Sequence, residues 1–237
     1  FSVAGGAAIA WLLQAAEQWR ARLAIPWYAV GGVLFFSAML FPITATLGKA
    51  NFRLSPEVGA TLDGDAFMAA TTDYYENYGK PIDMSLDYAA IQWLQDNVQG
   101  TPTIMEGRTR LEEYFWGSRI SIHTGLPGLV GWNFHQRQQR TLPGLGALVW
   151  QRVANVNQFY TTTDTLEAWR ILMAYDVEYI VVAALERVNY GESGGLNKFE
   201  SMVADGWLER AHVVNGTPVV YRVIKEQGPS IYVASLP

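Results

Sequence analysis

A run of 26 residues without a charged side chain, residues 23–48, constrains this chain more than any other feature. About 20 apolar residues suffice for a helix that crosses the hydrocarbon core of a membrane, so this run is long enough to cross with some tilt. Its two prolines, Pro26 and Pro42, are tolerated better in membrane helices than in soluble ones. The alternative, a buried helix of a soluble core, would rarely run so far without charge. The sequence therefore predicts a transmembrane helix at residues 23–48.

Residues 1–16 are also uncharged and rich in small side chains, which predicts the end of a second transmembrane helix that starts before Phe1. Residues 17–22 then form a short loop that contains Arg20 and Arg22, and short basic loops stay in the cytoplasm. We therefore expect a multi-pass protein of the cell membrane whose residues 49–237 form a domain outside the cytoplasm. On this interpretation the chain is part of a longer polytopic protein.

The amino-acid composition excludes several kinds of site and partner for that domain. The chain has no cysteine, which excludes disulfides, thiolate metal ligands and cysteine nucleophiles. Its three histidines are scattered along the sequence, so we expect no metal site. The net charge is −5 and there are no basic tracts, which argues against nucleic acid as a partner. The motifs of phosphate-binding loops, serine-hydrolase elbows and zinc proteases do not occur.

From residue 50 onward the hydrophobic pattern alternates between helix and strand periods, which is typical of an α/β domain. Asn215-Gly216 predicts a hairpin turn between the last two strands; with Thr217 it also matches a glycosylation sequon, but the hairpin is the simpler explanation. We expect one domain with a mainly parallel sheet and a C-terminal edge hairpin. Helices are expected at 84–100, 163–175 and 196–207, and strands at 101–106, 119–123, 177–185 and within 208–224.

The helix predicted at 84–100 has the best-defined ends. Ser85 is a suitable cap, Asp87 suits the first turn, and Gly100 ends the helix. For the helix that follows residue 162, Asp164 or Thr163 is the expected cap. The apolar positions of the first helix recur at helical spacing and predict a buried stripe of Leu86, Ala90, Trp93, Leu94 and Val98.

The strongest functional candidates lie in residues 114–163, a window of fifty residues without a single Asp or Glu. Four arginines give the window a charge of +4 in a chain whose total is −5. Such a local positive potential attracts anions, and the guanidinium group matches phosphate or carboxylate. Interleaved tryptophans could stack on a sugar ring or lie at a membrane interface. The candidate ligand-binding residues of the window are Arg119, His123, Trp132, His135, Arg137, Gln138 and Arg140.

Glu106 is the remaining candidate, because it ends a predicted strand and open α/β sheets bind ligands beyond the carboxyl ends of their strands. An ion pair with Arg119 or another nearby arginine is an equally good interpretation. Likewise, Arg119 and His123 could be strand residues paired with acids elsewhere, and residues 135–140 a solvated helical turn. The residues alone leave these alternatives open.

Several spaced motifs of the window agree in order with one family. They are R-I-S at 119–121, T-G-L-P at 124–127, G-W at 131–132, and H-x-x-Q-x-R formed by His135, Gln138 and Arg140. In this order the sequence resembles the YYY family, predicted polytopic membrane proteins of prokaryotes that are largely uncharacterised. The tyrosines of the family name could correspond to Tyr74, Tyr75 and Tyr78.

The YYY family is similar to membrane glycosyltransferases that take sugars from polyprenyl-phosphate donors. The resemblance implies that a catalytic acid lies on a loop before Phe1 and that this domain shapes an acceptor or anion site. No cofactor is evident beyond such a lipid-phosphate sugar donor. In that case Arg119, Arg137 and Arg140 would hold a phosphate or an anionic sugar, Trp132 would stack on a ring, and Glu106 or His135 would orient a hydroxyl.

The alternative is a non-catalytic, membrane-anchored subunit or scaffold that docks onto a larger membrane protein complex. Its partners would be membrane lipid and other membrane protein subunits. A shared pocket lined by Glu106, Arg119, His135 and Arg140 would favour the enzyme, whereas burial of these side chains in mutual ion pairs would favour the scaffold.

Overall fold

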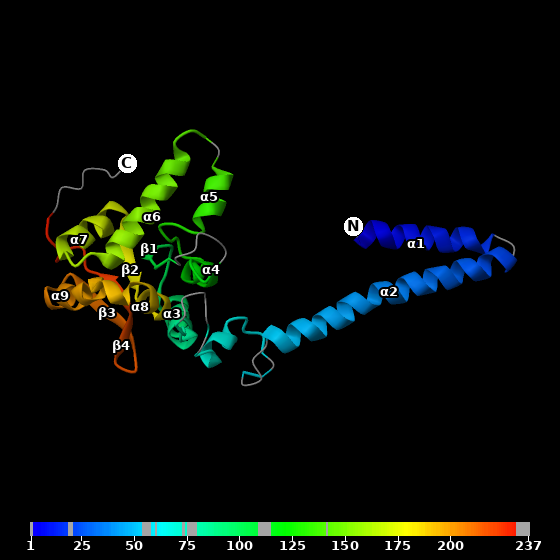
Figure 1. The fold of residues 1–237 in the computed structure, drawn as a ribbon, viewed down its shortest axis with the longest axis horizontal. Coiled ribbons are helices and arrows are strands. Elements are labelled where there is room, and N and C mark those ends of the chain that lie inside the picture. The colour runs from blue at the N-terminus through cyan, green and yellow to red at the C-terminus, as the bar shows by residue number, and fades with distance from the viewer. Residues whose placement is uncertain are drawn as a thin grey trace. The chain divides into compact units, whose positions relative to one another are not determined.

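The structure, a computed structural model, describes residues 2–18, 21–53, 58–59, 61–72, 74, 80–108, 115–140 and 142–230. The chain divides into two compact units, Phe1–Gly59 and Ala60–Pro237 (Figure 1). Three residues that the sequence analysis singled out, Tyr75, Tyr78 and Arg20, lie outside the described residues. The same holds for the side chain of Arg22.

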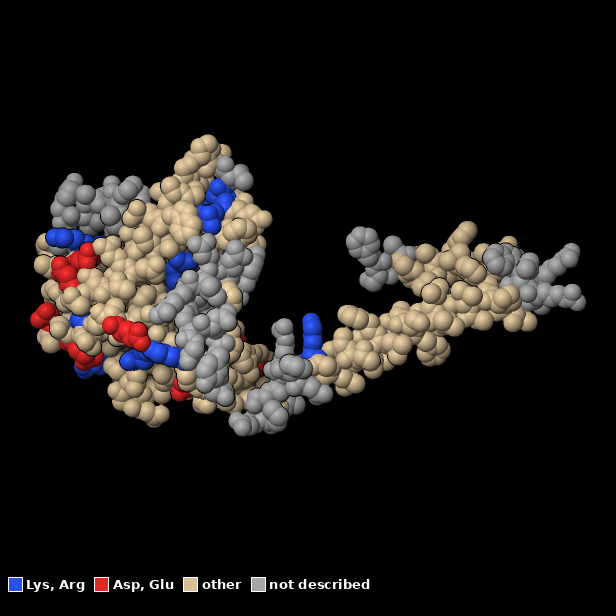
Figure 2. Space-filling model, viewed as in Figure 1, with Lys and Arg blue, Asp and Glu red and all other residues tan. Residues whose placement is uncertain are grey.

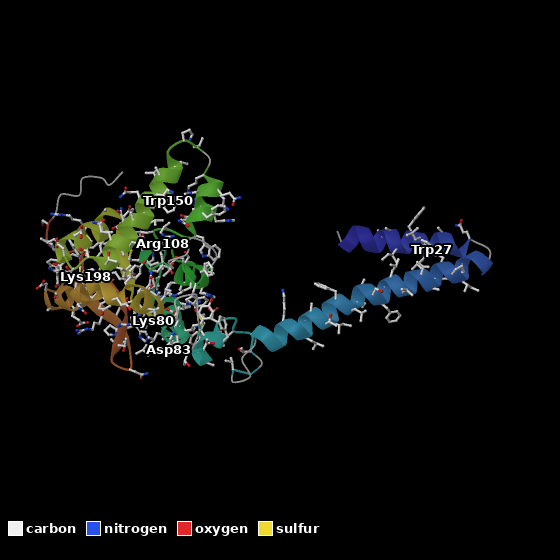
Figure 3. All side chains as sticks on the ribbon, viewed as in Figure 1. Trp27, Lys80, Asp83, Arg108, Trp150 and Lys198 are labelled. Atoms are coloured by element: carbon white, nitrogen blue, oxygen red, sulfur yellow. The ribbon has the colours of Figure 1, made fainter. Side chains whose placement is uncertain are left out.

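The N-terminal unit consists of two helices, α1 (Ser2–Glu17) and α2 (Ala21–Arg53). Helix α2 continues through both Pro26 and Pro42. Its segment Ala24–Lys49 is long and apolar enough to cross a membrane, with a mean hydropathy of 1.9, and none of its most apolar window is buried against other described residues. Figure 3 shows the described side chains of this helix as sticks, with Trp27 labelled near its N-terminal end. The apolar helix predicted at 23–48 is therefore present and extends further than expected.

The described residues of the C-terminal unit form four strands and several helices (Figure 1). The strands are β1 (Thr103–Met105), β2 (Val177–Val181), β3 (Leu208–Val214) and β4 (Thr217–Val223). The helices are η1 (Ala66–Ala70), α3 (Met84–Asn97), α4 (Arg119–Thr124), α5 (Asn133–Gln139), α6 (Leu145–Thr161), α7 (Thr165–Ala174), α8 (Ala184–Tyr190), η2 (Gly191–Ser193), η3 (Gly195–Asn197) and α9 (Lys198–Ala204).

The sheet has the order β1-β2-β4-β3. Strands β1 and β2 are parallel, whereas β4 is antiparallel to both β2 and β3. The expectation of a mainly parallel sheet is therefore wrong, because the second strand of the C-terminal hairpin, and not the first, lies beside β2. The hairpin itself is confirmed: Asn215 and Gly216 have φ values of 48° and 80°, as its tight turn requires.

Helices cover both faces of the sheet. Ile180 of β2 and Val182, which follows the strand, pack into a cluster with residues of α6, α7 and α9, whereas Val181 of β2 packs into a second cluster with residues of α3, α4 and α8. Alternate residues of a strand point to opposite faces, so a strand covered on both sides is apolar throughout. This explains why residues 180–182 are apolar without interruption, whereas Glu178 near the start of β2 is exposed.

Three local predictions need correction. The segment 119–123, predicted as a strand, is the helix α4. The cap of α3 is Asp83 and not Ser85, since the Asp83 carboxylate accepts the backbone N–H of Ser85. The buried face of α3 also differs from the predicted one, of which only Ala90 and Leu94 are buried. The buried residues of α3 include an acid and are Met84, Asp87, Ala90, Ile91 and Leu94.

Candidate functional site

Arg119 is the centre of a buried cluster of charged side chains. It is only 1% exposed. Its Nη2 atom lies 2.7 Å from Asp87 Oδ1 and 2.8 Å from Glu186 Oε2, and its Nη1 atom lies 3.8 Å from Glu106 Oε2. The four residues come from α3, the end of β1, the start of α4 and α8. The ion-pair interpretation of Arg119 and Glu106 is therefore the one that the structure shows.

Glu106 follows β1 at the carboxyl end of the parallel strand pair, as the sequence predicted. Its carboxylate accepts the backbone N–H groups of Ile120 and Ser121, at 2.9 and 3.1 Å, and the hydroxyl of Ser121. These are free donors of the first turn of α4, so Glu106 caps this helix from a distance of 14 residues in the sequence. Capping by a distant acid explains why residues 119–123 are helical despite a strand-like pattern.

Glu186 was not predicted as a site residue, yet it is fully buried and accepts four hydrogen bonds. Besides Arg119, it accepts the backbone N–H groups of Gly107 at 2.7 Å and Ala183 at 2.9 Å. A Cβ atom at Gly107 would lie 2.7 Å from Glu186 Oε1, so the close approach requires glycine. Glu186 thus joins the chain after β1 to the chain after β2.

Asp87 was expected only as a first-turn acid. It accepts from Arg119 and, at 3.0 Å, from the indole Nε1 of Trp116. A signal for its role exists in the sequence, because Asp87 stands at helical spacing with Met84, Ile91 and Leu94 on the buried face of α3. An acid on an apolar stripe indicates a buried cation as its partner.

Burial dominates the protonation of this cluster. It raises the pKa of Asp87 and of Glu106, and Arg119 offsets this effect only in part. Burial by itself would lower the pKa of Arg119, but the carboxylates of Asp87 and Glu186 outweigh it and raise that pKa well above its usual value. Arg119 thus stays charged, held by buried acids.

A pocket of about 240 Å³ lies beside this cluster. Trp132 forms one wall, and its indole Nε1 donates to the backbone oxygen of Gly117 at 3.1 Å. Trp116 forms another, with its ring 6.0 Å from the rings of Tyr74 and His123. The lining residues are Tyr74, Phe115, Trp116, Gly117, Arg119, Ile122, His123 and Trp132. Three predicted site residues, Arg119, His123 and Trp132, therefore line one pocket.

Two polar groups of the pocket differ in how they are held. His123 Nδ1 lies 2.7 Å from Asp65 Oδ1, an acid that stands just before η1. This confirms the interpretation that His123 pairs with an acid elsewhere. Arg119 Nε is a buried donor without an acceptor among the residues that the structure describes. A ligand oxygen in the pocket would supply the kind of partner that this atom lacks.

The other predicted residues lie elsewhere. His135, Arg137 and Gln138 are on α5, and Arg140 is its C-terminal cap. The guanidinium of Arg137 stacks on the ring of Trp150 in α6, 4.4 Å from its centre, and Arg140 is exposed and donates to the backbone oxygen of Gln136. None of the four lines the pocket. The residues predicted to form one site therefore lie in two separate places. One is the pocket, and the other is the helical hairpin formed by α5 and α6.

The side chains in and around the pocket are better suited to binding a ligand than to catalysing a reaction. Within the described parts of the chain, no group of three or more His, Asp or Glu side chains could hold a metal ion. Among the described residues, the acids nearest the pocket are already engaged: Asp87 and Glu186 by Arg119, Glu106 by α4, and Asp65 by His123. What the pocket offers is aromatic surface with a few hydrogen-bonding groups.

Comparison with known proteins identified no relative of this chain. No protein-family model matches the sequence, and neither a curated protein nor a solved structure is significantly similar to the chain.

Proposed function

We propose that this chain is the C-terminal portion of a multi-pass membrane protein that acts on a lipid-phosphate-linked sugar, and that residues 49–237 lie outside the cytoplasm. The pocket beside Arg119 holds the sugar ring of that ligand or of its acceptor. The catalytic acid is supplied from outside this chain, as the resemblance to the YYY family and to polyprenyl-phosphate-dependent glycosyltransferases implies.

The aromatic lining of the pocket is the observation that carries this proposal. Tyr74, Trp116 and Trp132 present rings around a small volume of about 240 Å³. Drug-sized ligands occupy pockets of roughly 300–1,000 Å³, so this one suits a single ring. Aromatic faces bind the C–H groups of sugars, and the edge groups of His123 and Arg119 match hydroxyl or phosphate oxygens.

Titration of the full chain in detergent with a short-chain polyprenyl-phosphate hexose tests the proposal. We expect Trp132→Ala to weaken binding about tenfold, since it removes one stacking wall. Trp150→Ala is the matched control, because Trp150 is exposed on α6 outside the pocket and should bind as the wild type does. Equal affinities for the two variants, or no binding by the wild type, would refute the sugar site.

The scaffold hypothesis remains the second candidate, because a specific observation favours it. Arg119 and Glu106 are buried in mutual ion pairs, which is what a structural role for them predicts. In that case the protein extracted from its own membrane with a mild detergent migrates as a larger complex with other membrane subunits. A particle of the mass of a single protein, together with sugar binding, would exclude this candidate.

A further inference from the structure

Arg119 lines the pocket, but its charge is already paired within the protein. Its Nη2 atom lies 2.7 Å from Asp87 Oδ1 and 2.8 Å from Glu186 Oε2, and its Nη1 atom donates to Glu186 Oε1 at 3.2 Å. Nη1 also lies 3.8 Å from Glu106 Oε2. Arginine holds a phosphate or a carboxylate through a fork of two N–H groups. Because both Nη groups are directed at the protein's own carboxylates, no such fork is left for an anionic ligand.

The buried acids around Arg119 also oppose a further negative charge. Asp87, Glu106, Glu186 and Arg119 are at most 4% exposed, so they contribute little to the charged surface of the C-terminal unit that Figure 2 shows. Burial raises the pKa of Asp87 and of Glu106, because this environment disfavours the negative charges that it already contains. An anion in the adjacent pocket would meet these acids with little screening by water.

The two tryptophans of the pocket offer ring carbon to a ligand. The indole Nε1 of Trp132 donates to the backbone oxygens of Phe115 and Gly117, at 3.3 and 3.1 Å. The indole Nε1 of Trp116 donates to Asp87. Since both indole N–H groups are bound within the protein, what remains for a ligand is the apolar surface of the rings. Such surfaces pack against the C–H groups of an uncharged ring.

His123 has one ring nitrogen that is open to a ligand. Its Nδ1 atom lies 2.7 Å from Asp65 Oδ1, and 23% of its side chain is exposed. A carboxylate beside Nδ1 fixes the proton there and leaves Nε2 of the neutral ring as a hydrogen-bond acceptor. Among the described residues, Nε2 has no hydrogen-bond partner. A hydroxyl group can donate to Nε2, whereas a carboxylate has no proton to donate.

We propose that the pocket selects an uncharged sugar ring, and that His123 sets this specificity by accepting a ring hydroxyl at Nε2. The inference rests on the proposed function, because it names the class of sugar that the same pocket takes. It differs from the expectation that Arg119 holds a phosphate or an anionic sugar. The phosphate of the lipid therefore lies outside the pocket, and sugars that carry a carboxylate are excluded from it.

Titration of the full chain in detergent with matched lipid-linked sugars tests this specificity. The probes are short-chain polyprenyl-phosphate glucose, the same lipid carrying glucuronic acid, and a series of deoxyglucose forms that each lack one hydroxyl. We expect the glucose lipid to bind about tenfold more tightly than the glucuronate lipid or better. One deoxy form should bind about three- to tenfold more weakly than glucose, since Nε2 loses its donor.

The variant His123→Phe identifies the group responsible for the hydroxyl preference. It keeps a ring in the wall of the pocket and removes Nε2, so it should bind glucose and that one deoxy form with equal affinity. His212→Phe is the matched control, because His212 lies in β3 and does not line the pocket. This control should keep the wild-type preference for every sugar in the series.

The outcomes separate this inference from the proposed function. Binding of the glucuronate lipid as tight as that of the glucose lipid, or tighter, would overturn the inference and leave the sugar site standing. The same holds if no single hydroxyl matters, or if His123→Phe retains the preference of the wild type. Failure of both sugars to bind would overturn the inference together with the proposed function.

Discussion

Arg119 places its positive charge in direct contact with three buried carboxyl groups, those of Asp87, Glu106 and Glu186. Removing ions from water is costly, and only mutual pairing and hydrogen bonds offset that cost. At the scale of the residue, Arg119 is therefore a structural cation whose edge also lines the pocket. Its contribution to stability can be separated from its contribution to binding.

Replacing Arg119 by Met tests the structural role. We expect the free energy of unfolding to fall by about 3–5 kcal/mol, because Asp87 and Glu186 are left as buried acids without a cation beside them. Chemical denaturation of the full chain in detergent measures this change. The matched control, Arg140→Met, removes an exposed arginine and should change the free energy by no more than about 0.5 kcal/mol. Similar stabilities of the two variants would contradict the buried-cluster interpretation.

The burial of Lys198 should make the stability of the protein depend on pH. It is buried between the rings of Phe159 and Phe199, and burial lowers its pKa to about 7. Between about pH 7 and 10.4 the unfolded chain binds a proton here that the folded chain lacks, so the free energy of unfolding rises with pH in this window. The slope is at most about 1.4 kcal/mol per pH unit.

Denaturation of the Lys198→Met variant at pH 7, 8 and 9 checks this sign. We expect the variant to lose most of the rise and to be more stable than the wild type at pH 7, because the buried charge is gone. Lys80→Met, at an exposed position, should keep the slope of the wild type. A wild-type stability that falls from pH 7 to pH 9 would show that the assignment to Lys198 is wrong.

At the scale of the element, α4 exists because of an acid outside it. Only six residues long, it begins after Ser118, whose φ is 64°, and ends at Gly125, whose φ is 75°. So short a helix has little stability by itself. The carboxylate of Glu106 holds its first turn, and His123 ties its last turn to Asp65.

Removal of the cap should therefore affect this element selectively. For Glu106→Ala we expect faster hydrogen exchange at the backbone N–H groups of Ile120 and Ser121, which lose their acceptor. Asp164→Ala is the matched variant, because Asp164 caps α7 by accepting the N–H groups of Leu166 and Glu167. The Asp164→Ala substitution should speed hydrogen exchange in α7 and leave hydrogen exchange in α4 unchanged. Exchange in α4 that is unaffected by Glu106→Ala would rule out the capping role.

At the scale of the whole molecule, an apolar helix precedes a mixed helix-and-sheet unit. The proposed topology places residues 17–22 in the cytoplasm and residues 49–237 outside it. Single-cysteine labelling distinguishes the two sides, because the protein contains no other cysteine.

In intact cells we expect a membrane-impermeant maleimide to label Leu62→Cys, an exposed position after the apolar helix. Gln18→Cys, in the short loop before that helix, should react only after the membrane is opened. Both positions are exposed, so the difference depends on the membrane and not on the fold. Labelling with the opposite pattern would reverse the orientation, and labelling of both in intact cells would show that α2 does not separate them.

Features that depend on neighbouring residues could be predicted from the sequence alone. The uncharged run predicted the apolar helix, Asn215-Gly216 predicted the hairpin, and the mostly apolar segment 177–185 predicted the strand β2. In each case the decisive interactions, whether hydrophobic periodicity or turn geometry, lie within a few residues of one another. The sequence also identified Arg119, His123 and Trp132, which line one pocket.

The tertiary structure decided everything that depends on partners distant in the sequence. Arg119 meets Glu186 across 67 residues, and α4 is helical because Glu106 reaches its first turn. The same long-range packing put β4 beside β2 and separated the pocket from Arg137 and Arg140 on the hairpin. The physical reason is that local propensities differ by about 1 kcal/mol or less per residue, whereas a buried charge without its partner costs several times more.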